Sequence, residues 1–157
     1  MLTGITKRPL KRFMGERGSF ADIIRSDWSD AFQDDVYQAN MSISYPGVVR
    51  AWHKHERGQI DCSLAINGTL KILAYDDKTQ DLDEVVSTGQ NFQGVRVPGN
   101  YWHGSKEKGN DPAMLVYFMN ELYDYEIPDG VLRPWIDQAV APTSINGTAG
   151  DPHCSSP

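Results

Sequence analysis

The residues from Asp61 to Tyr75, DCSLAINGTLKILAY, decide the fold of this chain. They form two short runs rich in apolar residues, and the dipeptide Asn67-Gly68 separates the two runs. Asn-Gly is typical of a two-residue hairpin turn, because both residues tolerate the positive φ angles that such a turn requires. The stretch therefore predicts two antiparallel strands, Asp61–Ile66 and Thr69–Tyr75.

Further strands are expected on both sides of this hairpin. Short apolar runs recur at roughly even intervals, separated by Gly, Pro and Asn, and such spacing is typical of an all-β sandwich or barrel. The segment Phe20–Phe32 allows a helical turn, but its first half reads as a strand. We expect one all-β domain over residues 1–140, with short helical turns at its periphery and further strands at Leu82–Ser87, Gly94–Val97 and Ala113–Met119.

Composition narrows the functional class. The chain has 157 residues, which suits one domain with a buried core and excludes two large domains. Its 15 Lys and Arg against 21 Asp and Glu give a net charge of −6, which argues against a general nucleic-acid binder.

No apolar run approaches the ~20 residues of a membrane helix. Two cysteines are too few for a disulfide scaffold, which favours the cytoplasm. Residues 141–157 read as a mobile tail.

Three histidines of the predicted domain are candidates for chemistry. A single histidine is more often a hydrogen-bonded structural residue than a catalytic one. However, His53 and His55 are two residues apart on a predicted strand, so their side chains point to the same face. His103 follows a turn at Pro98-Gly99 and an aromatic pair. A turn followed by a histidine with aromatic neighbours is typical of a strand that enters a site.

These spacings resemble the two motifs of the cupin superfamily, which implies a jelly-roll β-barrel (a double-stranded β-helix) with the histidines at its mouth. Over most of the chain, the sequence more closely resembles the cupin branch of dTDP-4-dehydrorhamnose 3,5-epimerase-like enzymes. The motifs that carry this resemblance, in chain order, are Arg17-Gly-Ser-Phe20, Gln38-Ala-Asn40-Met-Ser42-Ile-Ser44, Gly47-Val-Val-Arg50-Ala-Trp-His53, Gln59, Pro98-Gly99-x3-His103-Gly104, the pair Tyr117 and Tyr123, and Trp135-Ile-Asp137.

The resemblance implies an epimerase acting on a nucleotide-linked 4-keto-6-deoxy sugar at C3, C5 or both. Such a reaction removes a proton beside a carbonyl from one face of the sugar and returns one to the other face. It needs a base, an acid on the opposite face and a donor for the enolate oxygen, but no metal or redox cofactor. The resemblance assigns His53 as the base, Asp137 as the carboxylate that orients it, and Tyr117 as the acid.

The resemblance also implies a binding site for the nucleotide sugar. Arg17 pairs with the diphosphate, where a bidentate guanidinium is effective, and Arg50 and His103 lie near the enolate oxygen. The family is typically homodimeric with exchanged N-terminal strands, so Arg17 is expected to serve the neighbouring subunit's site. The remaining implied substrate-binding residues are Phe20, Gln38, Asn40, Gln59, Asp61 and Tyr123.

Asp61 departs from the family pattern, which has Lys at this position. A carboxylate beside a developing enolate repels it unless the carboxylate is protonated or paired. Two alternatives therefore stay open. One is a metal-dependent cupin, since imidazoles with an oxygen ligand suit Fe, Mn, Ni or Zn. The other is a non-catalytic sugar-binding cupin in which Asp61 marks lost activity. The metal ligands of the first alternative are His53, His55, Gln59 and His103.

Simpler structural roles also fit several of these residues when each is taken alone. Arg17 follows Glu16 and is compatible with a surface ion pair. Tyr117 lies within an apolar run and is compatible with a core position. Trp52 and Trp102, each next to a histidine, are expected in the barrel core or an interface rather than against a ligand. It is the joint order of the motifs that favours the epimerase interpretation.

Overall fold

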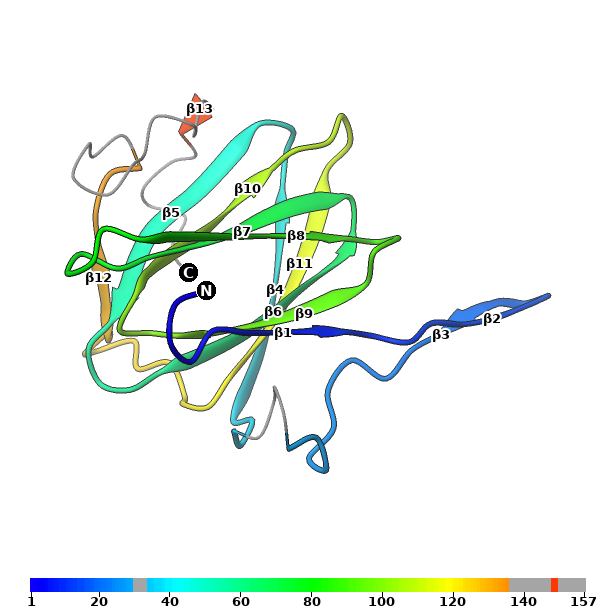
Figure 1. The fold of residues 1–157 in the computed structure, drawn as a ribbon, viewed down its shortest axis with the longest axis horizontal. Coiled ribbons are helices and arrows are strands. Elements are labelled where there is room, and N and C mark those ends of the chain that lie inside the picture. Colours follow the sequence, from blue (N-terminus) through cyan, green and yellow to red (C-terminus); the bar gives the residue numbers. More distant parts are fainter. Residues whose placement is uncertain (30–33, 136–147, 150–157) are drawn as a thin grey trace.

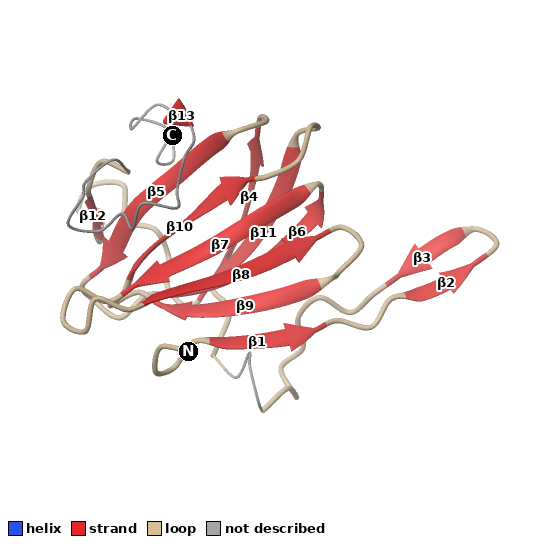
Figure 2. Ribbon diagram, turned by 45° about the horizontal axis from the view of Figure 1, so that its top comes forward, coloured by secondary structure: helices blue, strands red, loops and turns tan. Residues whose placement is uncertain are grey.

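The computed structural model describes residues 1–29, 34–135 and 148–149, and every regular element in them is a β-strand (Figures 1 and 2). The all-β prediction is confirmed, but the predicted helical turns are absent from these residues. The strand expected in the first half of Phe20–Phe32 is also wrong, because residues 21–29 form turns and irregular backbone. No helix in the described part of the chain is long and apolar enough to cross a membrane.

Two antiparallel sheets face one another and form the jelly-roll barrel (Figure 2). The first sheet has the order β1 (Thr6–Pro9), β9 (Gln93–Pro98), β6 (Ile60–Asn67), β11 (Ala113–Met119) and β4 (Gln38–Ser44). The second has the order β12 (Gly130–Leu132), β5 (Val48–His55), β10 (Trp102–Glu107), β7 (Thr69–Tyr75) and β8 (Leu82–Thr88), and β13 (Thr148–Ala149) pairs in parallel with β5.

Both strands predicted around the Asn-Gly dipeptide are present, but the prediction that they pair as a hairpin is wrong. Strand β6 lies in the first sheet and β7 in the second, so the Asn67-Gly68 turn connects the two sheets. Strand β7 has the predicted bounds, and β6 extends one residue beyond the prediction at each end. Gly68 has a φ of +73°, which a residue with a side chain rarely adopts. A Cβ at Gly68 would also lie 2.6 Å from Ala113 Cα. Glycine is therefore required here both by the turn conformation and by the close approach of β11.

The space between the sheets is apolar at one end of the barrel. Buried side chains of β7, β8 and β9 pack there against the N-terminal residues and Tyr101. The members of this cluster are Leu2, Ile5, Ile72, Ala74, Val85, Val95, Val97 and Tyr101. Burial of these side chains stabilises the sandwich, at about 25 cal/mol per Å² of apolar surface removed from water.

The outer faces of both sheets are covered as well. Trp52 and Trp102 pack with Leu73 and Tyr75 on the outside of the second sheet. The prediction that both tryptophans occupy packed positions is therefore confirmed. On the first sheet, Cys62 and Phe118 belong to an outer cluster that the segment around Trp28 covers.

Strands β2 (Phe13–Gly15) and β3 (Gly18–Phe20) form a separate hairpin that projects from the barrel (Figures 1 and 2). Its apolar side chains are exposed: Phe13 by 47%, Met14 by 74% and Phe20 by 64%. Three large exposed apolar side chains on one short hairpin are typical of a protein contact surface.

Candidate functional site

The strand register directs polar side chains into the barrel interior, next to the apolar cluster between the sheets. Asp61 on β6 is opposite Val97, and His103 on β10 is opposite Ala74. Directly paired residues point to the same face of a sheet, and both Val97 and Ala74 belong to the cluster between the sheets. Asp61 and His103 therefore approach each other from opposite walls of the barrel interior.

An irregularity in β5 brings Arg50 to the same face as His53. His53 is opposite His103 and Arg50 is opposite Ser105, so three steps along β5 match two steps along β10. Regular alternation would place Arg50 and His53 on opposite faces, and the extra residue reverses this. A glycine on β10 accommodates the bulge, because a Cβ at Gly104 would lie 2.4 Å from the Arg50 carbonyl oxygen.

The three histidines meet as the sequence predicts. The ring centroids of His53 and His103 lie 4.3 Å apart, those of His55 and His103 lie 5.2 Å apart, and those of His53 and His55 lie 6.1 Å apart. They come from two neighbouring strands, β5 and β10, of one sheet. The pairing of these strands, together with the two-residue spacing in β5, is sufficient to assemble the cluster.

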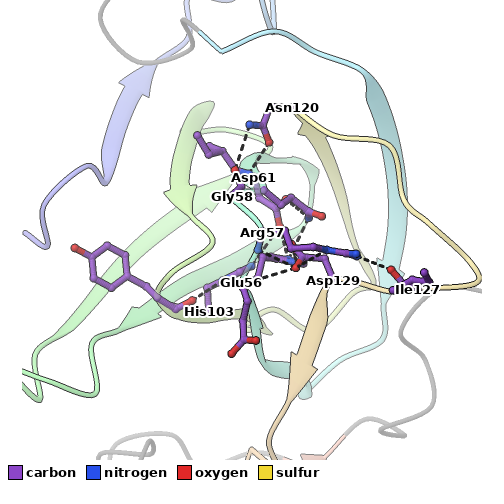
Figure 3. Close-up of polar contacts among 12 residues, drawn as sticks. Glu56, Arg57, Gly58, Asp61, His103, Asn120, Ile127 and Asp129 are labelled. Carbon is purple, nitrogen blue, oxygen red and sulfur yellow. Dashed lines mark hydrogen bonds and ion pairs between the residues drawn. The ribbon is translucent and has the colours of Figure 1, made fainter.

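Asp61 is buried within this cluster and is held by three side chains. Its Oδ2 lies 3.3 Å from His103 Nε2 and 3.9 Å from His55 Nε2, and its Oδ1 accepts a 2.8 Å hydrogen bond from Gln59 Nε2 (Figure 3). Burial by itself raises the pKa of Asp61, but the hydrogen bond and positive charge of His103 outweigh this and lower it to about 2. The Asp61 carboxylate is therefore ionised and paired.

The other nitrogen of His103 is also fixed. Nδ1 lies 2.9 Å from the carbonyl oxygen of Tyr101, which only accepts. Both ring nitrogens of His103 thus face acceptors, one a carbonyl and one a carboxylate. This arrangement suits an imidazolium that donates to Tyr101 and Asp61 together.

His53 and His55 are held as neutral rings. Burial, with the charge of His103 next in effect, lowers the pKa of His53 well below its usual value. The same two causes lower the pKa of His55. A neutral imidazole is the form that accepts a proton, so His53 is in the correct state to act as a base.

The opposite wall of the barrel carries Tyr117. On β11, Tyr117 is opposite Ser63 of β6 and Asn40 of β4, so it shares the interior face with Asp61, which is two residues from Ser63. Gln38 and Asn40 extend this face, and Gln38 accepts a 2.8 Å hydrogen bond from the backbone N–H of Tyr123. The register thus places Tyr117 and His53 on facing walls.

Arg50 is anchored beside this polar interior. Its Nε donates to Ser44 Oγ at 3.2 Å, and its Nη2 donates to the Ile43 carbonyl oxygen at 3.1 Å. The contacts tie β5 to β4 across the open side of the barrel. They hold a positive charge at the edge of the site.

Two predicted site residues, Arg17 and Phe20, are not brought to His53 within this chain, and for a third the structure gives no position. Arg17 lies in the turn of the projecting β2–β3 hairpin, and Phe20 ends the same hairpin (Figure 1). Asp137 lies outside the described residues, as does nearly all of the predicted tail. The prediction that Asp137 orients His53 therefore stays a prediction.

Sequence reasoning missed Asp129, which precedes β12. Its Oδ1 accepts hydrogen bonds from the backbone N–H groups of Glu56 and Arg57 at 3.1 and 2.9 Å, and from Arg57 Nε at 3.3 Å (Figure 3). Its Oδ2 lies 3.7 Å from His55 Nδ1. In the sequence, Asp129 stands in a Pro-Asp-Gly run that reads simply as a turn, which is why it was not recognised.

The cluster also has the composition of a metal site. One ligand atom each from His53, Asp61 and His103 lies within 4.8 Å of the other two. Two imidazoles with one carboxylate suit Zn²⁺ or Fe²⁺. Gln59 presents its amide nitrogen to Asp61, so Asp61 rather than Gln59 offers the oxygen ligand in this arrangement.

Comparison with known proteins identifies the family. The family model "Polysaccharide biosynthesis C-terminal domain" matches residues 14–131. The probable low-salt glycan biosynthesis epimerase Agl13 of Haloferax volcanii is 41% identical over 133 residues, which cover 82% of this chain and 85% of the relative. The spore coat polysaccharide biosynthesis protein SpsL of Bacillus subtilis is 30% identical, covering 89% of this chain and 94% of the relative.

Solved structures support the fold assignment. The rmlC epimerase of Mycobacterium tuberculosis superposes with a TM-score of 0.83 at 19% identity, covering 99% of this chain and 84% of that chain. The resemblance to the cupin epimerases is therefore confirmed in fold and in sequence. The chain belongs to the polysaccharide biosynthesis C-terminal domain family, and it has the jelly-roll fold of the rmlC epimerase.

Proposed function

We propose that this protein is an epimerase that inverts C3, C5 or both of a nucleotide-linked 4-keto-6-deoxyhexose, with His53 as the base and Tyr117 as the acid. His53 takes the proton next to the carbonyl, and the electrons of the broken C–H bond form the enolate. Tyr117 then gives its hydroxyl proton to the same carbon from the opposite face. Exchange with solvent restores both residues, so no co-reactant is consumed. Asp137 would stabilise the protonated His53.

The observation that carries this proposal is the placement of His53 and Tyr117 on facing walls of one polar interior. His53 pairs with His103 on one sheet, and Tyr117 lies beside Ser63 on the other. A substrate ring between the two sheets would meet a neutral imidazole on one side and a phenol on the other. Inversion at carbon requires this two-sided arrangement, whereas simple sugar binding does not.

The pairing of Asp61 supports catalysis in spite of its charge. An isolated carboxylate would oppose an enolate, but the donors of His103 and Gln59 are directed at Asp61 and offset its charge. Arg50 keeps a positive charge at the edge of the same interior. We propose that Arg50 stabilises the enolate oxygen in place of the family's Lys.

Product analysis tests the proposed function. Nucleotide-linked 4-keto-6-deoxyhexoses carrying dTDP or UDP are incubated with the protein, and the sugar ring is followed by proton NMR coupling constants. We expect a new diastereomer with inverted C3 or C5 from at least one substrate. Unchanged sugars in all cases, with binding still measurable, would favour the non-catalytic cupin instead.

We further propose that the protein is a homodimer in the cytoplasm, with the β2–β3 hairpin placed on the partner. This would bury Phe13, Met14 and Phe20 and deliver Arg17 to the partner's diphosphate site. Mixing Arg17→Ala with His53→Ala subunits tests the exchange. If the hairpin completes the partner's site, mixed dimers regain up to one intact site per dimer. Equal inactivity before and after subunit mixing would contradict the exchange.

A metal-dependent epimerase is the second candidate, and the proximity of His53, Asp61 and His103 favours it. In that case His53, Asp61 and His103 would hold the ion, which would polarise the carbonyl oxygen as a Lewis acid. Elemental analysis of the purified protein distinguishes the two candidates. Stoichiometric Zn or Fe, with activity lost on chelation and restored by the metal, would support the metal-dependent reaction. Activity that persists in metal-free protein would exclude it.

A further inference from the structure

A second carboxylate faces the histidine cluster from outside the barrel wall. Asp129 immediately precedes Gly130, which pairs with His55, so the two residues lie at the same end of the β5–β12 pairing, and both are largely buried, with side-chain exposures of 14% and 11%. Asp129 Oδ2 and His55 Nδ1 are buried atoms with no hydrogen-bond partner among the described residues. They lie 3.7 Å apart and point at each other.

The hydrogen bonds around His55 determine whether Nδ1 or Nε2 carries its proton. Asp61 is an ionised carboxylate and only accepts, so the Gln59 amide must turn its nitrogen toward it. The same amide nitrogen lies 3.1 Å from His55 Nε2. Its second N–H therefore donates to His55, and Nε2 must be bare. The single proton of the neutral ring is then on Nδ1, directed at Asp129.

We propose that Asp129 is a positioning residue that fixes His55 as its Nδ1-protonated tautomer and thereby orients Gln59 and Asp61. The contacts form one directional chain, in which Asp129 orders His55, His55 accepts from Gln59, and Gln59 donates to Asp61. None of these four side chains reacts with the sugar. The role of these contacts in catalysis rests on the proposed epimerase function, because they hold the carboxylate that pairs with His103.

The neighbours of Asp129 fix its orientation. Oδ1 accepts from two backbone N–H groups and from Arg57 Nε, while Arg57 Nη2 donates to the Ile127 carbonyl oxygen (Figure 3). Three donors at Oδ1 leave only Oδ2 for His55. The separation of 3.7 Å is longer than a hydrogen bond, and such contacts in unliganded sites commonly shorten when a substrate binds.

Asp129→Asn is the informative substitution. The three donors at Oδ1 keep the amide oxygen of the new side chain in that position, so its NH2 group must face His55 Nδ1. That nitrogen then becomes an acceptor and the proton moves to Nε2, where it opposes the Gln59 N–H. Asp124→Asn is the matched control, because Asp124 also accepts two backbone N–H groups in the same segment but contacts no histidine in the described part of the chain.

Two measurements on the full chain test the proposal. Long-range ¹H–¹⁵N NMR reports the tautomer of His55, and we expect Nδ1–H in the wild type and in Asp124→Asn but Nε2–H in Asp129→Asn. Epimerisation should slow by roughly 10- to 100-fold in Asp129→Asn, as when an orienting carboxylate is removed from a metal-bound histidine. Adding Asp129→Asn to His55→Gln should produce no further loss, because the effect passes through His55.

An Nε2-protonated His55 in the wild type would overturn the proposal, and so would an unchanged tautomer in Asp129→Asn. If the losses in epimerisation rate of the two single variants add up in the double variant, Asp129 acts independently of His55 and only stabilises its own loop. The wild-type spectrum is decisive by itself if Asp129→Asn does not fold. Since NMR needs no turnover, this test remains valid even if no sugar is epimerised, and the two proposals can fail separately.

Discussion

Asp61 Oδ2 lies 3.3 Å from His103 Nε2, across the barrel interior and 42 positions along the chain. This contact pairs a carboxylate that would otherwise be buried without a partner for its charge. The two ring nitrogens of His103 lie within hydrogen-bond distance of two acceptors, with Nε2 next to Asp61 Oδ2 and Nδ1 next to the Tyr101 carbonyl oxygen. The charge that would oppose the enolate is therefore paired before any substrate enters.

Removing the Asp61 carboxylate should destabilise the fold. Asp61→Ala leaves His103 and Gln59 buried without their shared acceptor, and loss of one member of a buried pair typically costs about 3–5 kcal/mol. Urea denaturation at neutral pH measures the free energy of unfolding. Asp27→Ala is the control, because Asp27 pairs with Arg25 at the solvent-exposed surface, where loss of an ion pair changes the free energy of unfolding much less. Similar losses in the two variants would show that the Asp61 contacts contribute little.

Stability should fall as the pH drops below the ordinary histidine pKa. The folded-state pKa values of His53 and His55 are lowered, chiefly by burial. Below about pH 6.5 the unfolded chain therefore binds protons that the folded protein does not, which favours unfolding. Denaturation curves between pH 7.5 and pH 5 (~0.5-unit steps) measure the slope of the free energy of unfolding against pH. The slope should be smaller in His55→Gln, and an identical slope in the two proteins would contradict a buried neutral His55.

Replacing Tyr117 should separate proton removal from inversion. Tyr117→Phe lacks the hydroxyl that returns a proton to the second face, so formation of the inverted sugar should fall by about 10²- to 10⁴-fold. His53 can still remove and return a proton on its own face. In heavy water the variant should therefore incorporate deuterium without inversion. Full inversion activity in Tyr117→Phe would assign the acid to another residue.

The close contact at Gly104 should not tolerate a side chain. A Cβ there would lie 2.4 Å from the Arg50 carbonyl oxygen and 2.5 Å from Ala51 Cβ, so Gly104→Ala must displace β5 at its bulge. Overpacking of this kind typically costs about 1–3 kcal/mol. Gly130→Ala, also in the second sheet, is the control because nothing lies within 4 Å of its Cβ. In thermal unfolding, Gly104→Ala should have a lower melting temperature than Gly130→Ala. Equal melting temperatures would contradict the close contact at Gly104.

The sequence was sufficient to predict what local patterns determine. The Asn67-Gly68 turn and the apolar runs on either side of it predict strands β6 and β7 and the turn between them, because turn geometry and alternation act over a few residues. They do not reveal that the two strands belong to different sheets. The two-residue spacing of His53 and His55 likewise predicts a shared face. These features need no knowledge of which distant strands pair.

Features that depend on long-range register could not be predicted in the same way. Arg50 joins His53 on one face only because β5 contains an extra residue opposite β10, and no local signal marks it. Asp61 contacts His103 only because β6 and β10, which belong to different sheets, face each other across the barrel interior. Asp129 looks like an ordinary turn residue, and only the folded chain brings it to His55.

Solvent exchange tests the central claim most directly. A nucleotide-linked 4-keto-6-deoxyhexose is incubated in heavy water with the wild-type protein and with His53→Gln, and mass spectrometry and NMR locate the deuterium. The account predicts deuterium at C3, C5 or both with the wild type, and loss of this incorporation in a folded His53→Gln variant. Undiminished incorporation in His53→Gln, or none with the wild type on any such sugar, would contradict it.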